Sequence, residues 1–161
     1  GWLWCASGGF WTFHSWDGCE GIDSPHYKAP GAEFIRPMAE FFRSFPFWRL
    51  APNHTAIQAQ AQGLVSAALA EADRSLALAY LCTEETGRKV EGAALQVRLP
   101  NGRYRVSFLA PADGRLLRSL EHTSVGLRET ARLSLPAFED DLVVKIERLE
   151  RRKPSLMPGT Q

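Results

Sequence analysis

Tryptophan is absent from the C-terminal two thirds of this 161-residue chain. All five tryptophans precede residue 50, together with seven of the nine phenylalanines. The later residues are poor in aromatic side chains and have the alternating pattern of β-strands. This asymmetry predicts two physically different pieces that meet near Pro52.

Other absences narrow the class of protein. No apolar run approaches the length needed to span a bilayer. The net charge is +1, which favours neither nucleic acid nor an anionic membrane as a partner. Cys5, Cys19 and Cys82 form no C-x-x-C pair and no metal-finger spacing. Buried free thiols are the favoured interpretation, with a Cys5–Cys19 bridge as the alternative.

Familiar catalytic and metal-binding patterns are also missing. The sequence has no Ser-His-Asp set, no phosphate loop and no zinc spacing. Asp17, Glu20, Asp23 and His26 share one glycine-rich loop, but their irregular spacing fits no calcium loop. A solvated acidic loop is favoured there, so we expect neither a metal nor a cofactor.

The N-terminal piece has the rhythm of an α/β unit. Residues 1–7 are typical of the last turns of a buried helix, with Gly8 and Gly9 ending it. Phe10 to Ser15 is predicted to be a short strand that is apolar on both faces, as in parallel sheets covered by helices. Residues 16–31, rich in Gly, Asp and Pro, are expected to form a loop.

A helical pattern follows this loop. Apolar residues recur at helical spacing at Phe34, Met38, Phe41, Phe42 and Phe45. Pro37 is tolerated only in a first turn, so the regular helix is predicted to begin near Arg36. Pro46 and Pro52 bracket a segment that is expected to be an extended linker.

From Gly63 onward the period changes to two, which predicts strands. The alternating runs are Leu76-Leu78-Tyr80, Leu95-Val97-Leu99, Tyr104-Val106-Phe108, Leu133-Leu135 and Leu142-Val144-Ile146. About seven short strands at a spacing of about ten residues indicate an antiparallel sandwich. Asn101-Gly102 is the strongest signal for a hairpin turn. The tail, residues 151–161, is predicted to be disordered.

Several short motifs resemble a known family. GGFWTFHSW (residues 8–16), Pro30-Gly31-Ala32 and FFRSFPFWRLAPN (residues 41–53) are similar to the last strand and helix of (β/α)8-barrel glycosidases related to apiosidases. In that family a small β-sandwich with a collagen-binding label follows the barrel. Residues 79–81, 102–104 and 108–115 resemble this second domain, although the family's Trp-Tyr-Asp-Pro is Ser-Phe-Leu-Ala-Pro here.

The resemblance implies an α+β fragment: the last βα unit of a (β/α)8 barrel, followed by an antiparallel β-sandwich of about seven strands. Residues 1–53 would be the end of a barrel, and residues 63–150 an accessory sandwich. Because the chain begins at Gly1 inside an element with the pattern of a buried helix, we expect it to be the C-terminal end of a larger protein. Any targeting signal would then be lost, which leaves the compartment open, with a secreted or periplasmic parent as one interpretation.

The resemblance also implies candidate site residues. Active sites of such barrels lie at the C-terminal ends of the strands, so the strand from Phe10 to Ser15 would deliver His14, Trp16 and Asp17 to the mouth. Trp16 would be a platform for a sugar face, with His14 and Asp17 binding hydroxyls. Plain packing is the alternative for Trp16, and a satisfied core histidine is the alternative for His14.

Glycoside hydrolysis requires two carboxylates across the scissile bond. In the resembled family these follow earlier strands, so the chain is expected to be catalytically silent alone, with carbohydrate as the substrate of the full-length parent. The sandwich would stabilise the enzyme; the alternative is a non-catalytic binding module for polysaccharide or protein. Contact with the missing barrel predicts a large exposed apolar patch around Trp2, Trp4, Trp11 and Phe13.

Overall fold

The structure, a computed structural model, describes residues 1–10 and 32–149. These residues form mainly antiparallel β-structure, with two α-helices and a short 3-10 helix. No helix in the described ranges is long and apolar enough to cross a membrane. The predicted strand from Phe10 to Ser15 and the predicted tail lie outside these ranges, apart from Phe10 itself.

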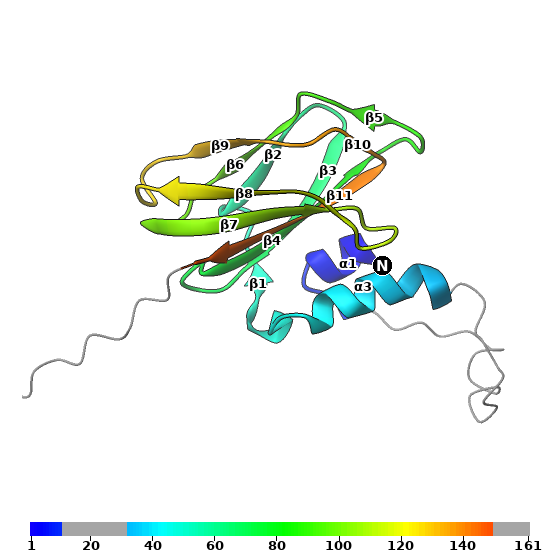
Figure 1. Cartoon of the computed structure of the whole chain (residues 1–161), viewed down its shortest axis with the longest axis horizontal. Coiled ribbons are helices and arrows are strands. Elements are labelled where there is room, and N and C mark those ends of the chain that lie inside the picture. Colours follow the sequence, from blue (N-terminus) through cyan, green and yellow to red (C-terminus); the bar gives the residue numbers. More distant parts are fainter. Residues whose placement is uncertain (11–31, 150–161) are drawn as a thin grey trace, which may run out of the picture.

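Three sheets hold all the strands of the described residues (Figure 1). The largest has the order β1-β3-β4-β11-β7-β8, with bounds Ala51–Pro52, Leu64–Ala70, Leu76–Thr83, Asp141–Arg148, Gly102–Leu109 and Leu116–Ser124. The second has the order β2-β6-β9, with bounds Ile57–Gln60, Ala94–Val97 and Ala131–Ser134. A small ribbon pairs β10 (Phe138–Glu139) with β5 (Lys89–Val90). The described residues therefore have a sandwich-like fold, as predicted, but with eleven strands instead of about seven.

The six-stranded sheet is apolar on both faces at its centre. On β11, Leu142, Val144 and Ile146 belong to the core between the sheets, whereas Val143 belongs to a second apolar cluster on the opposite face. Successive side chains of a strand point to opposite faces, so a strand buried on both sides loses its polar alternation. β4 accordingly has six buried residues in succession from Leu76.

The inner face packs against the three-stranded sheet. Tyr104, Val106 and Phe108 of β7 are fully buried there, together with Leu95 and Val97 of β6. These are alternating positions, so the sequence pattern located the inner face of both strands correctly. The main core of the sandwich therefore lies between the two sheets.

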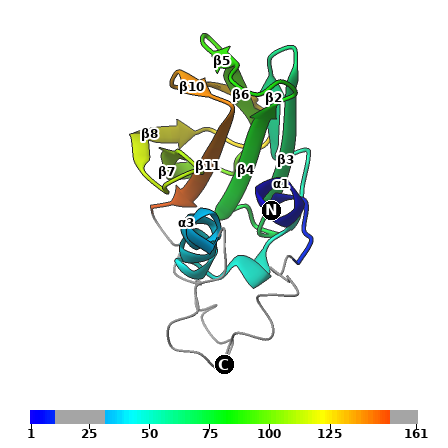
Figure 2. The same cartoon turned by 90° about the vertical axis from the view of Figure 1, so that its right-hand side faces the viewer.

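The outer face is covered by helices α1 (Trp2–Ala6) and α3 (Ala32–Arg43). Figure 2 shows α1 beside β3 and β4, and α3 near the end of β11. On β4 the large residues Leu76, Leu78 and Tyr80 face these helices, whereas Ala77 and Ala79 face the other sheet. The N-terminal segment thus supplies the second apolar layer of the sheet.

The predicted hairpin at Asn101-Gly102 is wrong. The strand before it, β6, pairs with β2 and β9, and the strand after it, β7, pairs with β11 and β8. Asn101 and Gly102 therefore lie on a crossover between sheets. Leu99 and Tyr104 are both buried in the core beside this crossover. Asp113-Gly114, in contrast, lies in the turn that joins the paired strands β7 and β8.

Two predictions about the N-terminal piece also need correction. Helix α3 begins at Ala32 and not near Arg36, with Pro37 inside it. A proline there removes one backbone hydrogen bond of the helix, but the burial of the apolar stripe offsets that loss. The expected extended linker contains a 3-10 helix, η1 (Phe47–Arg49), before it becomes extended in β1. The described fold is mostly β, with a weaker α+β character than expected.

Candidate functional site

An aromatic cluster joins the N-terminal segment to the outer face of the sheet. The Trp2 ring stacks on Tyr80 of β4, with centroids 6.1 Å apart and planes 6° apart. The same indole lies 5.3 Å from the Phe41 ring and 5.6 Å from the Phe42 ring, centroid to centroid. Contacts of this geometry contribute beyond simple burial. Trp2 therefore packs against helix α3 and the sheet at once.

The phenylalanine stripe of α3 faces the sheet, as its spacing predicts. Met38, Phe41, Phe42 and Phe45 are buried in this cluster. The ammonium of Lys145, on β11, lies 4.9 Å from the Phe45 ring centroid. An ammonium over an aromatic face is attracted by the ring quadrupole. The C-terminal half of the helix, together with Phe45 in the turn that follows it, thus packs on the sheet.

The end of α1 lies close to the linker. Gly8 has φ +91°, a conformation that favours glycine, and a Cβ built there would lie 2.7 Å from Cγ of Pro52. The Trp4 indole N–H donates to the Phe10 carbonyl at 2.9 Å across this turn. The Gly8-Gly9 helix end predicted from the sequence is therefore confirmed, and the glycine is required by both conformation and space.

An apolar groove opens beside this turn. It has a volume of about 220 Å3 and is lined by Cys5, Gly9, Phe10, Ile35, Met38, Ala39, Phe42 and Phe47. On its rim Phe10 is 84% exposed, and nearby on α1 Trp4 is 60% exposed. Large apolar side chains this exposed, next to an apolar groove, are typical of surfaces that bind another protein segment. We call Trp4, Phe10 and the groove the apolar shelf.

The expected exposed patch is thus confirmed for Trp4 but not for Trp2, which is half-buried. Trp11 and Phe13 lie outside the described residues. A further exposed tryptophan, Trp48 of η1, is 73% exposed and contacts Phe47 at 5.9 Å between ring centroids.

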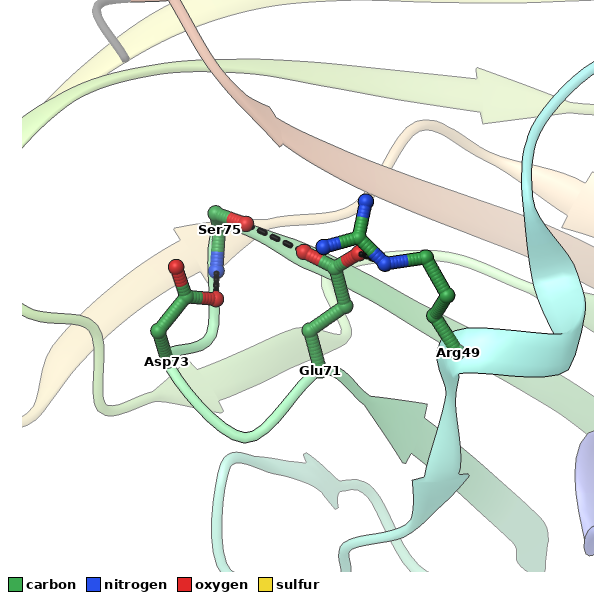
Figure 3. Close-up of polar contacts among 4 residues, drawn as sticks. All are labelled: Arg49, Glu71, Asp73 and Ser75. Carbon is green, nitrogen blue, oxygen red and sulfur yellow. Dashed lines mark hydrogen bonds and ion pairs between the residues drawn. The ribbon is translucent and has the colours of Figure 1, made fainter. Parts of the chain in front are cut away.

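A buried carboxylate ties the linker to the sandwich (Figure 3). Glu71, in the turn between β3 and β4, is the one charged residue that is buried within the described ranges. Its carboxylate accepts a hydrogen bond from the Ser75 hydroxyl and lies 3.1 Å from Nε of Arg49. Burying an unpaired charge is costly, so this pair stabilises one arrangement of η1 against the turn.

A second polar group lies at the opposite end of β4. The Tyr80 hydroxyl donates to Oδ2 of Asp141 at 2.8 Å. Burial raises the pKa of Asp141, and the nearby Asp140 carboxylate adds to this, whereas the Tyr80 hydrogen bond opposes it. Burial also raises the pKa of the Cys82 thiol beside them, so it is a poor nucleophile. These groups lack the paired, differently tuned carboxylates of a glycosidase.

The site residues predicted from the sequence, His14, Trp16 and Asp17, all lie outside the described residues. Within the described ranges no group of three or more His, Cys, Asp or Glu side chains is placed to hold a metal ion. Sequence reasoning missed Glu71 and its partner Arg49. A glutamate just after the apolar strand 64–70, with Ser75 four residues later, was the available signal.

Comparisons with known proteins concern the fold. No family model matches the sequence, and no curated protein matches it either. A structure described as a glycoside hydrolase is similar with a TM-score of 0.52 and 14% identity, over 88% of this chain and 29% of that one. A glycoside hydrolase family 5 protein from Bacteroides vulgatus has a TM-score of 0.52 and 17% identity, over 75% of this chain and 25% of that one. The chain therefore has the fold of part of these glycoside hydrolase structures and spans between a quarter and a third of their length.

Proposed function

We propose that this chain is the accessory part of a carbohydrate-active glycoside hydrolase, in which the sandwich stabilises a neighbouring hydrolase domain. The observation that carries the proposal is the apolar shelf. Its groove and exposed rings continue the cluster that packs on the sheet, so the described residues cover only part of one apolar surface. Two longer glycoside hydrolase structures contain a similar fold, which makes up between a quarter and a third of each. This similarity supports a hydrolase domain as the neighbour.

The proposal assigns this chain no catalytic carboxylate. Among the described residues, Glu71 is paired with Arg49 and Ser75, and Asp141 is held by Tyr80. The catalytic pair would belong to the hydrolase domain. His14, Trp16 and Asp17 would form one wall of its sugar site, as the resemblance to apiosidase-related barrels implies. The collagen-binding label of the resembled sandwich gains no support from these comparisons.

The test joins this chain to the polypeptide that its reading frame encodes ahead of Gly1. The parent protein is expected to hydrolyse glycosides, and Trp4→Glu should lower its unfolding temperature because a charge is then buried against the neighbouring domain. Gln58→Glu is the matched control, since it adds the same charge at an exposed position on the three-stranded sheet. Equal unfolding temperatures for the two variants would contradict the docking role. A reading frame that encodes no glycoside hydrolase domain there would contradict the whole proposal.

The alternative is a non-catalytic module that binds polysaccharide or protein. One observation favours it: a wide pocket at the far end of the sandwich, separate from the apolar shelf. The two functions are compatible, because the pocket and the groove share no residue.

A further inference from the structure

A wide concavity lies where three connections of the sandwich meet. Its volume is about 920 Å3, within the range of about 300–1,000 Å3 that is common for small-molecule sites. It is lined by the β3–β4 turn (72–74), the crossover between the sheets (100–102), the loop after β8 (125–128) and Arg148 at the end of β11. We call it the loop-end pocket.

The pocket walls are held in place by defined contacts. Arg148 donates a hydrogen bond to the Asn101 carbonyl, and its guanidinium carbon lies 5.6 Å from the Tyr104 ring centroid. Arg74 donates to the Arg98 carbonyl at 2.8 Å and has φ +54°, a strained conformation for a non-glycine residue. Strained backbone that neighbours hold in place is often found at binding sites.

The charge of the lining favours an anion. The lining contains three arginines, Arg74, Arg128 and Arg148, and a single carboxylate, that of Asp73. The Ser75 backbone N–H donates a hydrogen bond to the Asp73 carboxylate and lowers its pKa. This carboxylate therefore already has a hydrogen-bond donor within its own turn. Arg128 is exposed and has no hydrogen-bond or ion-pair partner within the described part of the chain. A guanidinium in this position is suited to a planar carboxylate.

The pocket also has an apolar side. Val125 is 63% exposed and Leu127 is 50% exposed, and Pro100 lines the same space. Apolar side chains beside arginines match a molecule with a C–H face and a carboxylate edge. A uronic acid unit of a polysaccharide has both, and an open pocket leaves room for the chain to continue.

We propose that the loop-end pocket binds acidic sugar units, with Arg128 as the contact to the carboxylate and Leu127 under the sugar ring. The inference rests on the proposed carbohydrate-active function for its choice of a sugar. The loop-end pocket shares no residue with the apolar shelf, so an experiment can contradict sugar binding without contradicting the docking of a hydrolase domain, and the reverse.

The test is calorimetric titration of the 161-residue chain with tri-galacturonate, its methyl ester and tri-glutamate. The ester keeps the sugar without the charge, and the peptide keeps the charge without the sugar. We expect tri-galacturonate to bind about tenfold more tightly than either, which corresponds to about 1.4 kcal/mol. Binding of the acid should weaken as salt rises, because exposed charges are screened.

Arg128→Gln should weaken binding of tri-galacturonate about tenfold without changing the unfolding temperature. Arg132→Gln is the matched control, since Arg132 is an exposed arginine on β9 outside the pocket. Equal binding of acid and ester, equal losses for the two variants, or no heat at millimolar ligand would each overturn the inference. Equal binding of tri-glutamate would show a site for acidic peptides and overturn the sugar assignment. None of these results bears on whether Trp4 docks a hydrolase domain.

Discussion

Trp2 and Tyr80 stack face to face, with ring centroids 6.1 Å apart, although 78 positions separate them in the sequence. Tyr80 in turn donates to Asp141 on the neighbouring strand. The N-terminal helix is therefore bound to the centre of the six-stranded sheet, and the aromatic-rich piece and the strand-rich piece share one apolar cluster.

This cluster predicts unequal effects for two tryptophans of the same helix. Trp2→Ala should lower the free energy of unfolding by about 3 kcal/mol, because it removes contacts with three rings. Trp4→Ala should cost less than about 1 kcal/mol, because Trp4 is mostly exposed. Urea unfolding followed by circular dichroism measures both. Equal costs would mean that the Trp2 stack contributes nothing particular to the fold.

Gly8 offers a test of backbone geometry. Gly8→Ala places a Cβ against Pro52 and keeps a left-handed φ, so we expect a loss of about 2 kcal/mol. Gly87→Ala is the control, since Gly87 has a similar φ of +78° but nothing within 4 Å of the added Cβ. That variant should lose only about 1 kcal/mol. The difference in unfolding free energy isolates the contact between the end of α1 and the linker.

The ion pair between Arg49 and Glu71 predicts non-additive mutations. Arg49→Ala leaves the buried carboxylate with Ser75 alone, and Glu71→Gln removes the charge that Arg49 neutralises. Because the Arg49 side chain is 54% exposed, we expect a coupling free energy of only about 1 kcal/mol. A double-mutant cycle in thermal unfolding measures it. Additive effects would show that the linker is held by its apolar contacts alone.

The raised pKa of Asp141 predicts a pH dependence of stability. In the folded state this carboxyl keeps its proton at a pH where the unfolded chain, with a pKa near 3.8, has lost it. Its contribution to stability is therefore present below the unfolded pKa and is lost as pH rises through the folded pKa. Asp141→Asn removes the titration and keeps an acceptor for Tyr80. The stability of the variant relative to the parent chain should therefore increase between pH 3 and pH 7; a constant difference would contradict the burial of Asp141.

Local patterns in the sequence predicted the strands but not their partners. The alternation of Leu142, Val144 and Ile146 located β11 and its inner face, because a period of two is a local property of a strand. Asn101-Gly102 predicted a hairpin, but the choice of sheet depends on contacts distant in sequence, such as the Ser124 hydroxyl donating to the Leu99 carbonyl. No local signal carries that information.

For the helices and the candidate sites too, local patterns predicted the elements but not the contacts between them. The spacing of Met38, Phe41 and Phe42 predicted the buried face of α3. Pro37 suggested a later start, because local helix propensity does not include the free energy of tertiary packing. On β4 the sequence pattern could not tell that Leu78 faces the helices and Ala79 the core. The loop-end pocket brings Arg74 and Arg128 together from two separate connections with Arg148 from the end of β11, so only the fold reveals it.

Solvent labelling of Trp4 and Phe10 shows whether the apolar shelf docks on a second domain. Hydroxyl-radical footprinting, read by mass spectrometry, compares this chain alone with the same chain joined to the hydrolase domain that we propose as its neighbour. Our account predicts that both side chains react readily alone and are protected in the longer protein, whereas Leu127 at the loop-end pocket is labelled equally in both. Equal labelling of Trp4 and Phe10 in the two proteins would contradict the docking proposal, because the apolar shelf would then have no partner in the longer protein.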